Sequence, residues 1–118
     1  MLAARYRMTR STEFAATVKH GVRAAQPDIV VHVRRDDADA EGPRVGLVIA
    51  KSVGTAVQRH QVARRLRHVA KSLIPDLDPR DRVVIRALPG SSAAASTRLE
   101  QQLRKGVRRS HDIMAGTR

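Results

Sequence analysis

The sequence predicts an α+β fold in which helices pack against a β-sheet, and three observations support this prediction. Two stretches rich in β-branched residues, 28–35 and 44–50, have the composition of strands, and a third, 82–88, follows later. The segments around them carry apolar residues at helical spacing. We therefore expect the order α, β, β, α, β, α, allowing for one extra short strand, in a single domain of 118 residues.

The N-terminal part is predicted to be a short basic arm, residues 1–10, followed by a helix. We expect the arm to be partly flexible, and its cations can reach phosphate groups: Arg5, Arg7 and Arg10. The helix is predicted to start at Ser11, a typical capping residue, and to stop at Gly21. Its apolar residues recur every four positions: Phe14, Val18 and Val22.

The first two predicted strands differ in their apolar content. Residues 44–50 (RVGLVIA) are almost continuously apolar, which favours a central strand. The connection 36–43 (DDADAEGP) contains four acids, so a cation-binding loop is one alternative. The order of these acids does not match the liganding positions of an EF-hand, and we expect a solvated hairpin loop instead.

The most informative stretch is Lys51 to Lys71, which predicts a helix with two different sides. A capping box formed by Thr55 and Gln58 places its start near Ala56. One side carries an apolar stripe, which should face the core: Val62, Leu66, Val69 and Leu73. The other side carries solvated bases: His60, Arg64, Arg67 and Lys71.

The charge of the chain is strongly positive and unevenly distributed. It has 23 Lys and Arg against 11 Asp and Glu, a net charge of +12, and no acid lies between Glu41 and Asp76. A merely solvated basic helix is one alternative, but such helices usually carry acids that pair with their bases. The chain lacks the Trp and Phe anchors of a membrane-surface helix, so we expect a nucleic acid as partner and no membrane.

The last third of the sequence predicts a turn, a strand and a helix. Residues 75–79 (PDLDP) are typical of a turn, and Pro89 ends the strand that follows. A second capping box, 97–100, is predicted to open a helix that ends near Gly116. This helix is also basic: Arg104, Lys105, Arg108 and Arg109.

No catalytic motif was found in the sequence. It has no cysteine, glycine-rich phosphate loop or His-Glu-x-x-His pattern, and we predict neither catalytic residues nor a bound metal. His60 and His68 lie two helical turns apart, which is a weak metal site that contacts to RNA explain as well. The lack of cysteines, of a signal peptide and of a membrane-spanning segment favours the cytoplasm.

The pattern Lys51-x-x-Gly54-x-Ala56-Val57-x-Arg59, followed by Arg64 and Arg67, resembles the signature of the bacterial ribonuclease P protein subunit. Two further segments are similar to that family: residues 7–14 resemble its entry into the first helix, and residues 44–47 its central strand. Element order, length and basicity agree over nearly the whole chain.

The resemblance implies a compact α/β sandwich with a left-handed strand-helix-strand crossover. It also implies a function as the protein subunit of an endoribonuclease whose chemistry is performed by a catalytic RNA with magnesium ions, bound chiefly by that RNA. The enzyme removes the 5′ leader from precursor transfer RNA, and one protein per RNA is expected.

Site residues follow from the same resemblance. We expect contacts to the catalytic RNA from one set of residues: Lys51, Arg59, His60, Arg64, Arg65, Arg67 and Lys71. The leader is expected in a cleft between the first helix and the sheet, lined by Phe14, Val18 and His32. Gln61 and Ala63 depart from the commonest family pattern, which has cations there, and Arg65 is expected to supply one of them.

Two other classes of protein share some of these features. A non-enzymatic ribosomal-type RNA-binding protein would share the charge and the fold, but it would not need the spacing of Lys51, Gly54 and Arg59. A small basic nuclease acting unaided would need a constellation of His or carboxylate groups, which the sequence does not contain.

Overall fold

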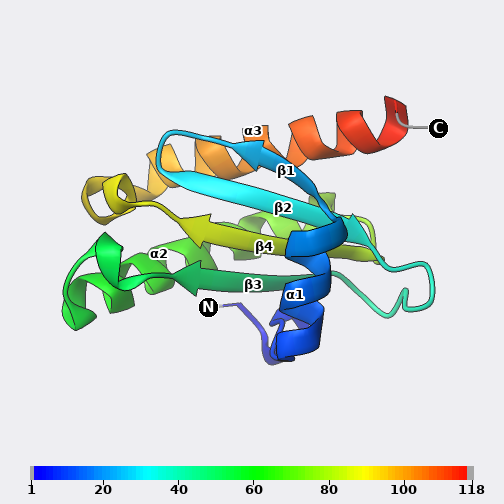
Figure 1. The fold of residues 1–118 in the computed structure, drawn as a ribbon, viewed down its shortest axis with the longest axis horizontal. Coiled ribbons are helices and arrows are strands. Elements are labelled where there is room, and N and C mark those ends of the chain that lie inside the picture. Colours follow the sequence, from blue (N-terminus) through cyan, green and yellow to red (C-terminus); the bar gives the residue numbers. More distant parts are fainter. Residues whose placement is uncertain (1, 117–118) are drawn as a thin grey trace.

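The computed structural model describes residues 2–116, which are built around a four-stranded mixed sheet (Figure 1). The strands lie in the order β1-β2-β4-β3, with β3 and β4 parallel and the other neighbours antiparallel. Their bounds are β1 (Val22–Ala25), β2 (Ile29–Arg35), β3 (Arg44–Ile49) and β4 (Asp81–Ala87). The extra short strand that the prediction allowed for is β1, and it begins at Val22, which had been expected on the first helix.

Helices cover both faces of the sheet. Helix α1 (Ser11–His20) lies across one face, and α2 (Ala56–Leu73) and α3 (Ser96–Gly116) lie on the other (Figure 1). Followed from β3 through α2 to β4, the connection is left-handed, an exception to the usual rule (Figure 1). Short 3₁₀ turns connect these elements: η1 (Ala4–Tyr6), η2 (Lys51–Val53), η3 (Ile74–Asp76) and η4 (Pro89–Ala93).

The hydrophobic core lies between the sheet and the pair α2 and α3. It is aliphatic, and its fully buried members come from the sheet and from both helices: Ile29, Val31, Val33, Val83, Ile85, Val62, Leu66, Leu99 and Leu103. Alternation along β2 and β4 then turns the intervening residues toward α1. The two faces of the sheet therefore differ. The face toward α2 and α3 is buried by apolar packing, and the face toward α1 is only partly covered.

Strand β3 lies at an edge of the sheet, so the prediction of a central strand for residues 44–50 was wrong. Strand β3 is apolar for another reason. The N-terminal arm runs along its outer edge and covers it. The Met8 N–H donates to the Val45 carbonyl at 2.9 Å, and Leu2 and Met8 are both buried. The central positions belong to β2 and β4.

The acidic connection 36–43 is not a hairpin loop, because β4 lies between the two strands that it joins. Strand order is a non-local property that the local sequence does not encode. The Asp39 carboxylate in this connection lies 3.0 Å from the Arg82 guanidinium and 3.6 Å from that of Arg44. Neighbouring arginines thus neutralise this acid.

Helix ends were predicted with mixed success. The capping box of Thr55 and Gln58 is present, with both hydrogen bonds made. The box predicted at 97–100 is wrong, because α3 already begins at Ser96 and the Glu100 carboxylate accepts a hydrogen bond from Ser72 Oγ at 2.9 Å. Ser11 is the first residue of α1 and not its cap.

Candidate nucleic-acid interface

The segment from Lys51 to Thr55 sets the position and direction of α2. Gly54 has φ of +155°, a conformation that side-chain-bearing residues rarely adopt. A Cβ at Gly54 would also collide with the Gln58 amide, which folds back to accept the Thr55 N–H at 2.8 Å. The capping box therefore requires the glycine, and Lys51 is exposed three residues before that glycine.

Helix α2 presents the two sides that the sequence predicted. Its apolar stripe is buried, together with Ala63: Val62, Leu66, Val69 and Leu73. The opposite side is solvated, with His60, Arg64 and Lys71 exposed and Arg59 and Arg67 half-buried. Because the stripe is fixed on the sheet, these cations form a rigid row.

The cations of α2 have no acidic neighbours within the described residues. None of them lies within 4.0 Å of a carboxylate, whereas seven arginines elsewhere in the described residues do: Arg34, Arg35, Arg44, Arg80, Arg82, Arg98 and Arg104. The cause is the acid-free run between Glu41 and Asp76. The positive potential of this side is therefore available to an external anion.

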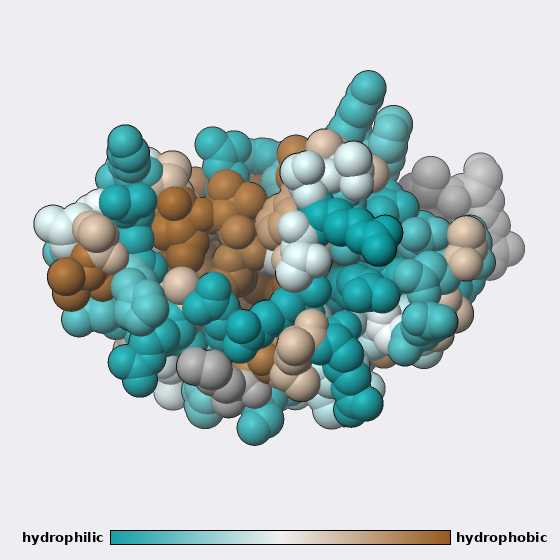
Figure 2. All heavy atoms as spheres, turned by 90° about the horizontal axis from the view of Figure 1, so that it is seen from below, coloured by the Kyte–Doolittle hydropathy of each residue, from teal (hydrophilic) through white to brown (hydrophobic). Residues whose placement is uncertain are grey.

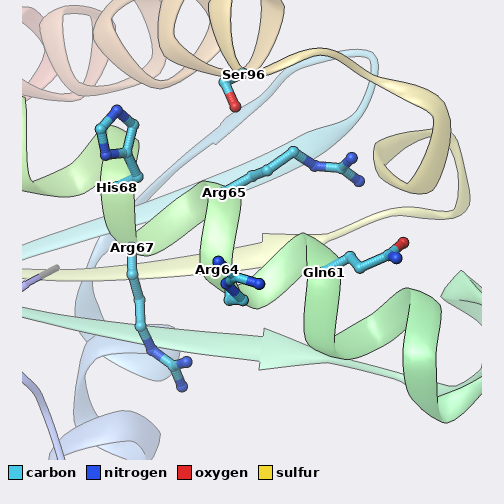
Figure 3. Close-up of a pocket in the computed structure, with 6 residues that line it drawn as sticks. All are labelled: Gln61, Arg64, Arg65, Arg67, His68 and Ser96. Atoms are coloured by element: carbon cyan, nitrogen blue, oxygen red, sulfur yellow. The ribbon is translucent and has the colours of Figure 1, made fainter.

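Part of the same side borders a groove of about 570 Å³ (Figure 3). Its lining comes from α2 and from the start of α3: Gln61, Arg64, Arg65, Arg67, His68 and Ser96. Arg65 differs from its neighbours, because it extends toward η4 and donates to the Ser92 carbonyl at 3.0 Å. It keeps its charge, but this contact fixes the side chain to the protein.

The predicted cleft residue Phe14 sits on the α1 face of the sheet, above Gly46 of β3. A Cβ at Gly46 would lie 2.5 Å from the edge of the Phe14 ring, so only glycine leaves room for the ring at this point. Beyond Gly46 the register continues through Val84 of β4 to His32 of β2. Phe14 and His32 thus share one face, separated by two strand spacings of about 4.8 Å each.

His32 and Val18 complete the predicted cleft but differ in exposure. Val18 is 47% exposed, whereas His32 is 6% exposed and its Nδ1 atom has no hydrogen-bond partner in the described structure. Burial lowers the pKa of His32, and the positive charges of Arg23 and Arg86 lower it further. The imidazole is therefore neutral at neutral pH.

Apolar side chains gather in a hollow beside the β3 edge, rimmed by hydrophilic ones (Figure 2). The sequence analysis missed three exposed residues of this α1 face: Val48, Arg86 and Arg23. A signal was present for Arg86, because alternation in 82–88 turns it away from the core. No comparable signal existed for Arg23, since the sequence did not indicate where the extra strand lies.

The described residues contain neither a candidate metal cluster nor a candidate membrane-spanning helix. That part of the chain contains no group of three or more His, Cys, Asp or Glu side chains arranged to bind a metal ion. His60 and His68 are exposed on α2 without such a group. None of the helices in residues 2–116 is both long and apolar enough to cross a bilayer.

A rigid row of unpaired cations on α2, together with an aromatic ring and exposed arginines on the opposite face of the sheet, is typical of a basic α+β domain that binds nucleic acid. The chain matches the family described as Ribonuclease P over residues 2–111. It therefore belongs to the ribonuclease P protein family, the protein component of the ribonucleoprotein that processes transfer RNA. Membership excludes the ribosomal-type alternative.

Relatives and solved structures agree with this assignment. The chain is 69% identical over 120 residues to the ribonuclease P protein component of Mycobacterium avium (strain 104), covering 99% of this chain and 98% of that protein. It is 62% identical to that of Mycobacterium ulcerans (strain Agy99), with full coverage of both (100% and 100%).

The fold is similar to the RNase P protein from Staphylococcus aureus at a TM-score of 0.77 and 19% identity, covering 87% of this chain and 93% of that one. It is also similar to the RNase P protein from Thermotoga maritima at a TM-score of 0.72 and 18% identity, covering 84% and 92%. At these identities the likeness concerns the fold, and it confirms the predicted sandwich.

Proposed function

We propose that this chain binds the catalytic RNA of ribonuclease P through α2 and binds the 5′ leader of precursor transfer RNA in the cleft under α1. The single observation that carries this proposal is the acid-free, rigid row of cations on α2. Fixed rows of arginine suit the shaped phosphate backbone of a folded RNA. The RNA-contacting residues are proposed to be Lys51, Arg59, His60, Arg64, Arg67 and Lys71.

The cleft suits a single strand for a different reason. Phe14 offers an aromatic surface on which a base can stack, and stacking on aromatic rings is tolerant of sequence. Val18 and Val48 add exposed apolar surface, and Arg86 adds a positive charge for the backbone. We propose that this combination binds leader nucleotides with little sequence preference.

Bond cleavage is assigned to the RNA in this proposal. The carboxylates beside the sheet bind arginines: Asp28 binds Arg98, Asp81 binds Arg35, and Glu13 binds Arg82. Magnesium prefers oxygen ligands with negative charge, and the cationic surface of α2 offers none, so this surface does not fit a magnesium ion. The ions are proposed to be bound by RNA phosphates.

The role of the protein is then to raise affinity. It reduces the repulsion between leader and catalytic RNA, which matters most when few magnesium ions are present. We propose a cytoplasmic complex with one protein per catalytic RNA, in which the chain acts as one RNA-binding domain. Arg65 supports the interface mainly by fixing η4 against α2.

The test is cleavage of a precursor transfer RNA at low magnesium concentration by the protein alone, by a bacterial ribonuclease P RNA alone and by both. We expect efficient cleavage at the leader junction only in the mixture. Cleavage by the protein alone would support an unaided nuclease, and a mixture no faster than the RNA alone would overturn the proposed role.

A further inference from the structure

A second group of cations lies far from the row on α2, at the opposite edge of the sheet. There β1 and the C-terminal half of α3 enclose a groove of about 740 Å³. Its charged lining is almost entirely positive, with Asp112 the one acid: Arg23, Lys105, Arg108, Arg109 and Asp112. The proposed function leaves this groove without a role.

Helix α3 packs closely against the sheet beside this groove. A Cβ at Gly106 would lie 2.7 Å from Val31 Cγ2, so a glycine is needed for the observed approach of helix and strand. Leu103 and Val107 are buried on the same side of α3. The cations at 105, 108 and 109 then line the groove beside the edge strand β1.

These cations are not balanced by neighbouring acids. Within the described residues, no carboxylate lies within 4.0 Å of Lys105, Arg108 or Arg109. Two other arginines of the same helix are paired, Arg98 with Asp28 at 2.6 Å and Arg104 with Asp76 at 2.9 Å. The same helix therefore carries paired cations on one side and unpaired cations on another.

The register of the sheet places one end of a row of paired residues on β3 and the other end at the groove. Val48, Arg86, Val30 and Ala25 are successive partners across all four strands, and Ala25 lines the groove. A strand of RNA that crosses the α1 face from β3 to β1 travels about 14 Å, three strand spacings. It then arrives at the groove, where Arg23 stands on the boundary.

We propose that the groove between β1 and α3 binds the sugar-phosphate backbone of leader nucleotides that extend beyond those in the cleft. This inference rests on the proposed leader site and extends it around the sheet edge. The argument is charge complementarity together with this register, since a polyanion that leaves the cleft toward β1 meets unpaired arginines. The residues that line the groove include no aromatic side chain on which a base could stack. We therefore expect contacts to the sugar-phosphate backbone and not to the bases.

The experiment measures binding of the reconstituted holoenzyme to two precursor transfer RNAs. Single-strand binding folds cover about 4 to 16 nucleotides, so the two leaders are about 4 and about 16 nucleotides long. In the variant Arg108→Ala/Arg109→Ala we expect affinity for the long leader to fall about fivefold to tenfold and that for the short leader to change less than about twofold. The salt slope for the long leader should fall by about 0.7 for each lost contact.

Two controls separate charge at the groove from other effects. Arg104→Ala removes one charge from the same helix outside the groove, and it should not discriminate between the leaders. Arg108→Lys/Arg109→Lys keeps the charge and should retain most of the affinity for the long leader. Both arginines are exposed, so the urea midpoint of the double alanine variant should match that of the unmodified protein.

The outcomes distinguish the groove from the cleft. If the double alanine variant weakens binding of both leaders equally, or of neither, the groove does not bind the distal leader. Phe14→Ala tests the cleft separately and should weaken binding of both leaders. If Phe14→Ala has no effect on either, the proposed leader site itself fails, whatever the arginines do.

Discussion

The arginines of this protein occupy two environments that differ in their acidic neighbours. Where β2 ends and β4 begins, Arg35 lies 3.2 Å from Asp81, and Arg82 lies 3.0 Å from Asp39. On α2, Arg64 and Arg67 have no carboxylate within 4.0 Å in the described structure. The same side chain thus stabilises the protein in one region and is available to RNA in the other. The positions of the acidic residues determine which of these two roles an arginine has.

Arg82 is the most deeply buried of the paired arginines. Its substitution should have the largest effect on stability. Its side chain is fully buried, and it bonds Glu13, Asp39 and the Gly42 carbonyl. Arg82→Ala leaves the Glu13 carboxylate without its partner and leaves Asp39 with Arg44 alone, so we expect a loss of about 3 kcal/mol in the free energy of unfolding, measured with urea.

The control for this prediction is a paired but exposed arginine. Arg104→Gln breaks a contact whose two side chains are 40% and 63% exposed, so it should cost less than about 1 kcal/mol. Equal losses for Arg82→Ala and Arg104→Gln would contradict the distinction between buried and surface pairs.

Arg59 represents the unpaired group, where the effect should fall on binding. Arg59→Ala should lower affinity for the catalytic RNA about fivefold, about 1 kcal/mol, and reduce the salt slope by about one phosphate contact. Stability should change by less than about 0.5 kcal/mol. Arg59→Lys is the matched variant that keeps the charge, and a slope unchanged in Arg59→Ala would exclude a phosphate contact there.

An acid placed on α2 should give some of its unpaired arginines a carboxylate partner. Gln61→Glu puts a carboxylate four residues before Arg65 and three before Arg64, and it should stabilise the helix by about 0.2–0.5 kcal/mol. RNA affinity should nevertheless fall, because the added charge repels phosphate. Gln61→Ala serves as the neutral control. If Gln61→Glu bound RNA as tightly as Gln61→Ala, acid-free charge would not explain the interface.

The smallest expected effect is on the pH dependence of stability and concerns His32. Its charged neighbours, Arg23 and Arg86, are two further arginines without a carboxylate within 4.0 Å in the described structure. Burial, Arg23 and Arg86 lower its pKa below the usual 6.5, so the unfolded chain binds more protons than the folded one just below that pH. Stability should therefore decrease as the pH falls from about 7 to about 5.

His32→Phe removes this titration and should flatten the dependence of the urea midpoint on pH. The lowered pKa values of Asp28, Asp39 and Asp78 place their titration below 3.8, outside this window. An equally steep dependence in His32→Phe would assign the pH effect to another group.

The sequence was most informative where structure is local. The apolar stripe of α2, its capping box and the three longer strands follow from periodicity and composition, and the structure confirms them. The extra short strand could not be located in advance, because the residues of β1, VRAA, contain a single β-branched side chain. The edge position of β3 was also missed, because it depends on which strands pair, and long-range pairing has no local signature.

The candidate site shows the same division. The unpaired charge of α2 follows from the acid-free run, which is visible in the sequence. The contact between the Phe14 ring and Gly46 involves residues that are far apart in the chain. Periodicity therefore gave no reason to expect it. The bond from Arg65 to the Ser92 carbonyl is equally non-local, so Arg65 could not be separated from its exposed neighbours beforehand.

The contact between the N-terminal arm and β3 has a practical consequence for the handling of this protein. The Met8 N–H donates to the Val45 carbonyl, and Leu2 fills a core position, so residues 2–8 cover an otherwise open strand edge. A chain shortened to begin at Thr9 would expose that edge together with the apolar surface beneath it. Uncovered edges are templates for intermolecular pairing, so such a chain should form oligomers and precipitate during storage.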